Sequence, residues 1–148
     1  LVIAGHGAGI RGVRCTAVRP GSSGQGTVPT LAYAVTRAIP MVPTPLVKDG
    51  RLFLWGDDGV VSCLRVANGE TVWRQRVNGA YYASPVWVDG HLYNVSKKGE
   101  VVVLAAADKF EVLCRVPLGE HSYATPAVAG GVMYLRTSSH LFSLGRPR

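Results

Sequence analysis

The chain carries the stretch Thr44-Pro45-Leu46-Val47-Lys48-Asp49-Gly50, and its form returns as Ser84-Pro85-Val86-Trp87-Val88-Asp89-Gly90 and Thr125-Pro126-Ala127-Val128-Ala129-Gly130-Gly131. The prolines Pro45, Pro85 and Pro126 stand 40 and then 41 residues apart, and a glycine follows each of them at the same distance. A period near forty residues, built of short apolar runs and turn glycines, is typical of one blade of a β-propeller. The repeat therefore predicts the architecture. It leaves the function open, because propellers carry many unrelated activities.

Each repeat contains short apolar runs separated by turn residues. In the first complete repeat the runs are 45–47, 52–55, 60–66 and 71–77. Asp-Gly and Asn-Gly pairs stand between them, and these pairs favour the tight turns of β-hairpins because glycine adopts positive φ freely. Four strands joined by three tight turns make a four-stranded antiparallel meander, which is one blade.

The repeat predicts an all-β chain that forms a single partial β-propeller over residues 1–148. Its four-stranded antiparallel blades are expected at roughly 1–37, 44–79, 84–119 and 125–145. The first unit lacks its first strand and the last lacks its fourth, so about three and a half blades are present. Closed propellers have about four to eight blades, and an open arc leaves strand edges unpaired. We therefore expect a C-terminal fragment of a longer propeller, closed by blades upstream or by a second chain; a self-contained four-bladed ring is the alternative.

Composition and charge limit the classes of partner. Of 148 residues, 47% are hydrophobic and 17% are charged, which favours a packed core over disorder. A net charge of +7 would favour binding to nucleic acid, but no more than two basic residues are adjacent, at Lys97-Lys98. Nucleic-acid binders cluster their basic residues, so no nucleic-acid partner is predicted. No apolar run approaches the roughly 20 residues that cross a bilayer, so no transmembrane segment is predicted.

Three cysteines, Cys15, Cys63 and Cys114, lie far apart and show no metal-ligand spacing. Each falls in an expected strand, where a free cysteine behaves as a small buried hydrophobe. Their odd number argues against a disulfide framework and favours buried thiols. The alternative is a single disulfide between two of the three cysteines.

Residues 59–73 resemble the PQQ-type propeller repeat, whose pattern is roughly A-L-D-x-x-T-G-x-x-x-W. The matching positions are Leu64, Gly69 and Trp73, whereas Arg65 and Asn68 replace the aspartate and the threonine. In the next repeat Lys109 and Leu113 occupy the glycine and tryptophan positions. We expect Trp73 to dock its blade against the neighbouring one, because large aromatic residues are more often core than ligand contacts.

The resemblance implies one of two kinds of protein. The family contains quinoprotein (PQQ-dependent) dehydrogenases, which use a calcium-bound quinone, adjacent cysteines and acidic ligands. It also contains non-enzymatic bacterial propellers such as the outer-membrane barrel-assembly lipoprotein. This chain has no Cys-Cys pair and no carboxylate cluster of the enzyme type, so no catalytic, cofactor-binding or metal-binding residue is predicted. The non-enzymatic branch implies a periplasmic or extracytoplasmic location. The alternative is a fragment of a quinoprotein dehydrogenase whose cofactor residues lie in other blades.

A literal G-x-G-x-x-G begins at Gly7, after the first expected strand. A dinucleotide site needs this loop to open a helix, with an acidic residue about 20 positions later. A second expected strand follows instead, and no acid appears before Asp49. A glycine-rich turn between strands is therefore the interpretation of this segment.

One candidate face remains. If each blade runs outward from the axis, the turn between its second and third strands lies on the same face as the connections between blades. That face would gather Tyr81, Tyr82, His121, Tyr123, Asp57, Asp58, Lys97 and Lys98. Tyrosines among mixed charges are common at protein-binding surfaces. We predict a non-catalytic scaffold that binds a protein or peptide through this face. The alternatives are that the tyrosines only pad the crossing between blades, or that exposed aromatics bind polysaccharide.

Overall fold

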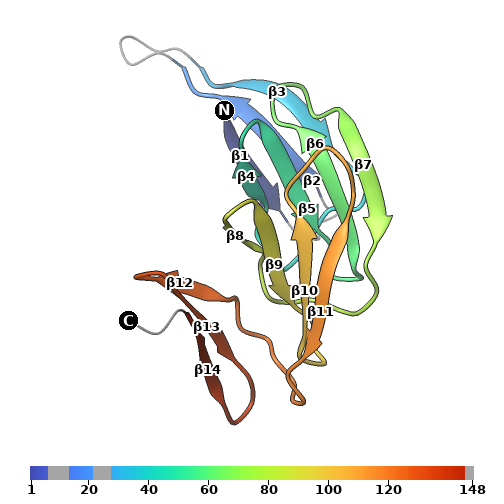
Figure 1. Ribbon diagram of the computed structural model, residues 1–148. Coiled ribbons are helices and arrows are strands. Elements are labelled where there is room, and N and C mark those ends of the chain that lie inside the picture. Colours follow the sequence, from blue (N-terminus) through green and yellow to red (C-terminus); the bar gives the residue numbers. More distant parts are fainter. Residues whose placement is uncertain (7–13, 22–27, 146–148) are drawn as a thin grey trace.

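A computed structural model of the protein describes residues 1–6, 14–21 and 28–145 (Figure 1). These residues form 14 strands in four antiparallel sheets. The glycine-rich segment that begins at Gly7 lies outside the described residues. No helix in the described part of the chain is long and apolar enough to cross a membrane.

The sheets follow the chain order, and we number them as blades. The first blade contains β1 (Val2–His6), β2 (Arg14–Arg19) and β3 (Thr30–Val35). The second contains β4 (Leu46–Lys48), β5 (Arg51–Trp55), β6 (Val60–Arg65) and β7 (Thr71–Arg76). The third contains β8 (Val86–Val88), β9 (His91–Val95), β10 (Glu100–Ala105) and β11 (Val112–Pro117). The fourth contains β12 (Ala127–Ala129), β13 (Val132–Arg136) and β14 (Leu141–Leu144).

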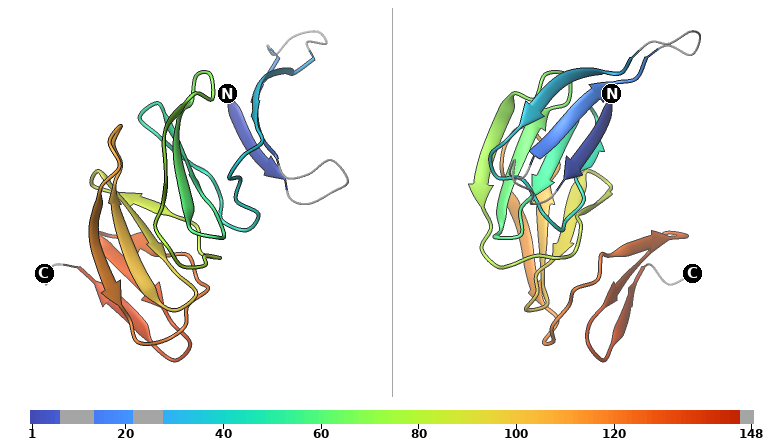
Figure 2. Two further views of the ribbon diagram at one scale, coloured as in Figure 1. Left: turned by 90° about the vertical axis from the view of Figure 1, so that its right-hand side faces the viewer. Right: turned by 180° about the vertical axis from the view of Figure 1, so that it is seen from behind.

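The blades stand one after another in a fan, as Figure 2 shows from two sides. Within each blade every strand pairs antiparallel with the strand next to it in sequence. This meander confirms the prediction of an all-β partial propeller with four-stranded antiparallel blades. The second and third blades have four strands, and the described residues supply three to each of the others.

Two-residue turns join the first two strands of the second and third blades. Asp49 and Gly50 have φ of 48° and 72°, and Asp89 and Gly90 have φ of 45° and 80°. Positive φ at both central residues is the hairpin geometry that Asp-Gly pairs favour. The repeated Asp-Gly pair therefore forms the first turn of the second and third blades.

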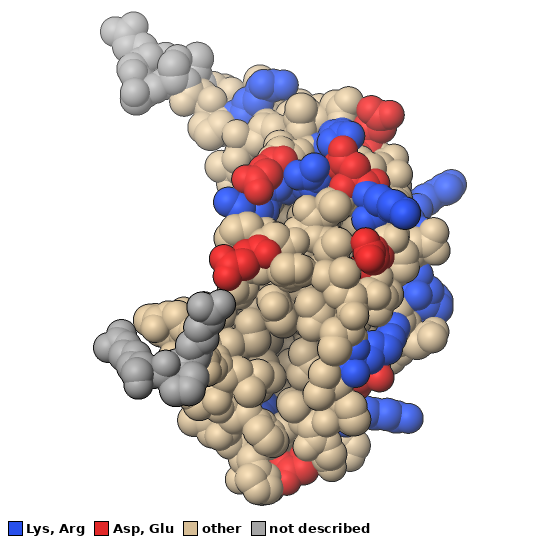
Figure 3. Space-filling view, viewed as in Figure 1, with Lys and Arg blue, Asp and Glu red and all other residues tan. Residues whose placement is uncertain are grey.

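An ion cluster on the surface joins the second blade to the third. Asp108, in the turn between β10 and β11, accepts a 2.7 Å bond from Nε of Arg51. It also accepts bonds of 3.1 and 2.9 Å from the guanidinium of Arg65. These bonds hold the pKa of Asp108 below its ordinary value. Figure 3 shows acidic and basic side chains intermixed over the upper part of this view, whereas the surface in its lower centre is mostly uncharged.

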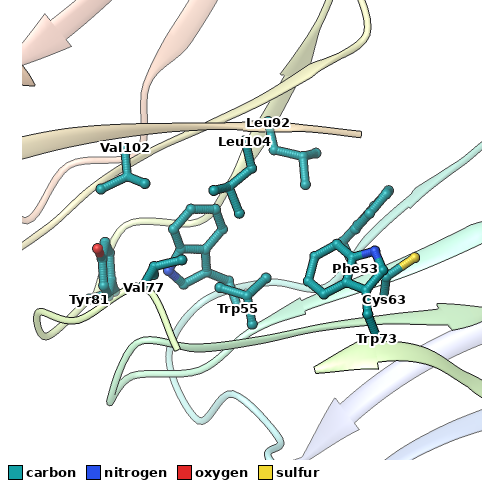
Figure 4. Close-up of a cluster of buried hydrophobic side chains, with 10 residues drawn as sticks. Phe53, Trp55, Cys63, Trp73, Val77, Tyr81, Leu92, Val102 and Leu104 are labelled. Atoms are coloured by element: carbon teal, nitrogen blue, oxygen red, sulfur yellow. The ribbon is translucent and has the colours of Figure 1, made fainter. Parts of the chain in front are cut away.

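The largest hydrophobic core lies between the second and third blades (Figure 4). The ring of Trp55 meets the ring of Tyr81 edge-on at 5.3 Å between centroids, and both residues are fully buried. Trp73 meets Phe110 of the third blade at 5.2 Å. Trp73 is therefore a residue of this core.

The pairing register corrects one position of the sequence repeat. A β-bulge interrupts the outer strand pair of each of the first three blades, and Tyr33, Trp73 and Cys114 occupy the equivalent place beside it. Cys114, rather than Leu113, thus stands where the second blade has its tryptophan. The three cysteines are free thiols. Cys15 and Cys63 are buried as expected, and burial raises the pKa of Cys63 to about 11. The expectation was wrong for Cys114, which is exposed because the described residues place no strand over β11.

An apolar groove of about 410 Å³ separates β11 from the fourth blade. Val116 and Leu118 line one side, and Phe142 and Leu144 line the other. All six residues of β11 are exposed, whereas Trp73 on β7 is covered by the third blade. Among the described residues no strand pairs with the outer edge of β14.

Candidate functional site

Backbone hydrogen bonds hold the turns and the blade connections together on one face. Tyr81 N, in the connection from the second to the third blade, donates to Asp57 O at 2.9 Å. Lys97 N, in the turn between β9 and β10, donates to Ala80 O at 2.7 Å. The turns between second and third strands therefore lie beside the blade connections.

The same arrangement recurs at the next blade. Ser122 N donates to Lys97 O at 3.3 Å, and Ser138 N donates to His121 O at 3.0 Å. We use the name connection face for the surface formed by the turns 56–59, 96–99 and 137–140 and by the connections 77–85 and 118–126.

Two tyrosines and a lysine form a cluster on this face. Tyr82 and Tyr123 lie in successive connections with ring centroids 6.0 Å apart. Nζ of Lys97 lies 4.1 Å from the centroid of Tyr82 and 5.8 Å from that of Tyr123. Tyr82 is 45% exposed and Tyr123 is 59% exposed, so both residues are accessible to a partner. We refer to these three residues as the tyrosine–lysine cluster.

Two hollows flank the cluster. The larger measures about 620 Å³, and its lining includes Gly79, Ala80, Lys97, Lys98, Glu100, His121 and Tyr123. The smaller measures about 230 Å³, and His121 and Tyr123 line it as well. These two residues therefore form the wall between the hollows. A hollow of this size fits a few side chains of a partner.

Tyr81 does not belong to the exposed part of this face. The sequence predicted Tyr81 on this face, but its side chain is fully buried against Trp55. Its hydroxyl donates a 2.8 Å hydrogen bond to Asn78 O, and burial raises the pKa of Tyr81 to about 12. The successive residues Tyr81 and Tyr82 thus split between the core and the surface. Such a split depends on how the connection turns, which the sequence pattern does not specify.

Asp57 and Asp58 lie on the connection face but in another blade, and both have partners. Asp57 accepts hydrogen bonds from Met41 N at 2.6 Å and Val42 N at 3.2 Å. Asp58 pairs with Arg76 at 3.2 Å. The Asp57 carboxylate thus secures the connection between the first and second blades, and Asp58 pairs within its own blade. They do not join the tyrosine–lysine cluster.

Glu120 secures the fourth blade in a similar way, a role that sequence reasoning missed. Its carboxylate accepts bonds from the hydroxyls of Thr137 at 2.7 Å and Ser139 at 2.6 Å, and from Ser139 N at 3.0 Å. The Ser139 hydroxyl is the leading cause that lowers the pKa of Glu120 well below its ordinary value. The only available signal was a glutamate in a connection opposite a serine-rich turn.

Glu120, Ser139 and His140 are an acid, a hydroxyl and a histidine in contact, which are the residue types of a catalytic triad. Nδ1 of His140 lies 2.6 Å from Oε1 of Glu120 and 3.1 Å from Oγ of Ser139. In a triad the acid and the nucleophile contact opposite ring nitrogens, so that the base can relay a proton. Here both contact the same nitrogen. The arrangement therefore orders a turn and does not activate a nucleophile.

The described residues contain no group of three or more His, Cys, Asp or Glu placed to hold a metal ion. His121 directs Nδ1 to Lys97 O at 3.0 Å, which fixes its ring beside the larger hollow. The chemistry offered by the connection face is thus aromatic stacking, ammonium charge and hydrogen bonding.

Four-stranded blades that repeat about every forty residues define the chain as a β-propeller. Comparison with family models then identifies the propeller family. The family model described as outer membrane protein assembly factor BamB matches residues 34–112 and 57–144. The chain therefore belongs to the PQQ-type β-propeller repeat family. No curated protein sequence matches it significantly.

Solved structures show the same fold at low sequence identity. BamB from Moraxella catarrhalis is 17% identical, with a TM-score of 0.57, and the alignment covers 79% of this chain and 40% of that protein. A europium-containing methanol dehydrogenase is 10% identical, with a TM-score of 0.60 and coverage of 77% and 22%. The quinohemoprotein alcohol dehydrogenase ADHIIG from Pseudomonas putida HK5 is 17% identical, with a TM-score of 0.56 and coverage of 68% and 17%. The chain thus spans less than half the length of each of these proteins.

Proposed function

We propose that this protein is a non-catalytic propeller scaffold that binds another protein or a peptide through its connection face. The observation that carries the proposal is the tyrosine–lysine cluster, in which two half-exposed rings from adjacent connections flank one ammonium group. Tyrosine supplies a large contact area with little loss of side-chain entropy, and it is enriched at binding hot spots. The hollows on either side give a partner's side chains a place to enter.

The family match supports an envelope location for this scaffold. BamB is described as an outer membrane protein assembly factor, and we propose a related periplasmic or extracytoplasmic setting here. The mixed character of the face fits a protein partner, because aromatic residues with a polar rim are the usual anatomy of such interfaces.

Site-specific photo-crosslinking in the native cells tests the proposal. A photoreactive amino acid is introduced at Tyr82, at Tyr123 and, as control, at Lys109 on the opposite end of the third blade. The same partner should crosslink from both tyrosine positions and not from Lys109. The partner is then purified, and the Tyr82→Ala/Tyr123→Ala variant should bind it at least tenfold more weakly than wild type. Tyr134→Ala, which removes a 36% exposed tyrosine elsewhere, is the matched control.

Two results would contradict the scaffold proposal. One is crosslinking no stronger at the tyrosine positions than at Lys109, and the other is unchanged affinity of the tyrosine variant. The alternative is that the chain is part of a quinoprotein dehydrogenase. The fold that it shares with two dehydrogenases suggests this alternative. Uptake of pyrroloquinoline quinone with calcium, measured by absorbance, followed by alcohol oxidation would favour this alternative.

We also propose that a further strand of the same protein pairs with β14 and fills the apolar groove beside β11. Cys114 and Val116 lie on one side of β11 because alternate residues of a strand share a face, and Val116 lines the groove. In protein isolated from its native cells, Cys114 should therefore resist a maleimide reagent until the protein is denatured. Rapid labelling of the native protein would refute the idea. Protection only in a dimer, shown by light scattering, would assign the strand to a second chain.

A further inference from the structure

The three equivalent turns of the connection face differ in charge. The turn of the second blade carries Asp57 and Asp58, and that of the third carries Lys97 and Lys98. The turn of the fourth blade carries two serines and His140, whose ring contacts Glu120. The two aspartates are occupied by backbone N–H groups and by Arg76. Of these three turns, only that of the third blade carries lysine or arginine.

These lysines have no acidic partner within the described residues. The ion pairs found there include neither Lys97 nor Lys98. Glu100, which lines the hollow, pairs with Arg115 at 2.8 Å, and the carboxylate of Glu120 is engaged by hydroxyls of the fourth-blade turn. The larger hollow therefore carries two ammonium groups whose charge the protein itself does not neutralise.

The position of Lys97 also restricts what can bind. Its ammonium group lies against the face of Tyr82, which holds the charge beside the exposed rings. A ligand that pairs with this ammonium group therefore places its adjoining atoms against Tyr82 and Tyr123. Such a ligand needs a negative group next to a flat or apolar group.

We infer that the larger hollow binds an acidic peptide segment in which a carboxylate side chain lies next to an aromatic one. The carboxylate pairs with Lys97 or Lys98, and the aromatic side chain packs on the tyrosines. This inference rests on the proposed function and names the chemistry of its partner. Lysine serves as a point charge, and the hollow contains no free guanidinium fork of the kind that favours phosphate recognition. A peptide carboxylate is accordingly favoured over nucleic acid.

Selection from a random peptide library tests the inference. The library is displayed on phage, selected on the wild-type protein and depleted on the Lys97→Gln/Lys98→Gln variant. Surviving sequences should be enriched in Asp or Glu beside Phe, Tyr or Trp. A selected peptide should bind wild type at least tenfold more tightly than its Gln-for-Glu counterpart, as measured by fluorescence anisotropy. Its affinity should also fall as the salt concentration rises, because exposed ion pairs are screened.

Three variants control for folding and for general charge effects. Lys97→Gln/Lys98→Gln should leave the unfolding midpoint close to that of the wild type, since neither side chain forms an ion pair within the described residues and Lys97 contacts only half-exposed rings. Lys97→Arg should retain most of the affinity because it keeps the charge against Tyr82. Lys109→Gln removes one exposed positive charge from the opposite end of the same blade and should leave the affinity unchanged.

The opposing outcomes are distinct. Selected peptides that are neutral or basic, but still depend on Tyr82 and Tyr123, would overturn the acidic-segment inference and leave the scaffold proposal standing. Failure to select any peptide would also overturn the inference, while the crosslinking experiment would decide the scaffold proposal independently. Tighter binding of a single-stranded oligonucleotide or an anionic oligosaccharide than of any selected peptide would assign the hollow to that class instead.

Discussion

The indole N–H of Trp73 donates a 2.9 Å hydrogen bond to the carbonyl oxygen of Ala107, and so links the outer strand of the second blade to the third. The hydroxyl of Tyr33 makes the equivalent 2.9 Å bond to Val66 O between the first and second blades. An aromatic ring packed between blades, with its polar atom tied to the next blade, is thus a repeated device. Cys114 ends the series, because its thiol offers neither the ring nor a strong donor.

The first prediction concerns this link. Trp73→Phe keeps an aromatic ring but removes the donor, and it should lower the free energy of unfolding by about 1 kcal/mol. Trp73→Ala also leaves a cavity and should cost about 3–5 kcal/mol. Urea denaturation measures both. Trp87→Phe is the control, because Trp87 is only partly buried. Its ring contacts the ammonium group of Lys48, with Nζ 4.3 Å from the ring centroid. Equal losses for Trp73→Phe and Trp87→Phe would show that the hydrogen bond contributes nothing.

The second prediction concerns the close approach of a turn to a connection. Gly99 has φ of 76°, and a Cβ placed there would collide with the carbonyl oxygen of Glu120. Gly90 has a similar φ of 80°, but a Cβ there meets nothing within 4 Å. Gly90→Ala should therefore cost only the left-handed strain of about 1–2 kcal/mol. Gly99→Ala should cost clearly more, because the backbone of the connection must also move. Equal unfolding free energies for the two variants would disprove this packing.

The third prediction concerns the ion cluster at Asp108. Because the folded state lowers the pKa of this carboxyl from its ordinary 3.8, the stabilisation is present above that ordinary value. It is lost as the pH falls through the folded-state pKa. The wild-type melting temperature should therefore exceed that of Asp108→Asn at neutral pH, and the difference should shrink as the pH is lowered below about 4. Asp89→Asn is the control, since Asp89 forms no ion pair among the described residues. A gap between wild type and Asp108→Asn that is constant with pH would contradict the assignment.

The fourth prediction concerns Glu120 and the turn 137–140. Loss of the carboxylate in Glu120→Ala removes the acceptor for Ser139 N and for three neighbouring hydroxyls. The amide hydrogens of this turn should then exchange with solvent several-fold faster. Hydrogen-exchange mass spectrometry measures the change, and Glu111→Ala, in the turn between β10 and β11 of the third blade, is the control. Unchanged exchange in Glu120→Ala would mean that the turn is ordered by its own backbone.

Much of the fold could be predicted from the sequence because its determinants are local. The Asp-Gly turns at Gly50 and Gly90 and the repeated prolines mark where each blade begins, and the structure has strands where these signals place them. The register of the outer strand could not be predicted as reliably. One additional residue in the turn before β11 moves Cys114 into the place that sequence alignment assigns to Leu113.

Less of the candidate site than of the fold could be predicted from the sequence. The sequence placed eight residues on one face, but it could not separate the exposed Tyr82 from the buried Tyr81, because neighbouring residues in a connection follow no regular alternation. Nor could it show that the acids near the cluster are engaged. That depends on contacts between residues far apart in the chain, such as Glu120 with Ser139.

The sequence by itself therefore determined the blade, its period and its turns, since hairpins form from residues adjacent in the chain. Only the tertiary structure decided which connection residues face solvent and which charges have partners. These properties arise where successive blades meet, and they left Lys97 and Lys98 without an acidic partner among the described residues, beside two exposed rings.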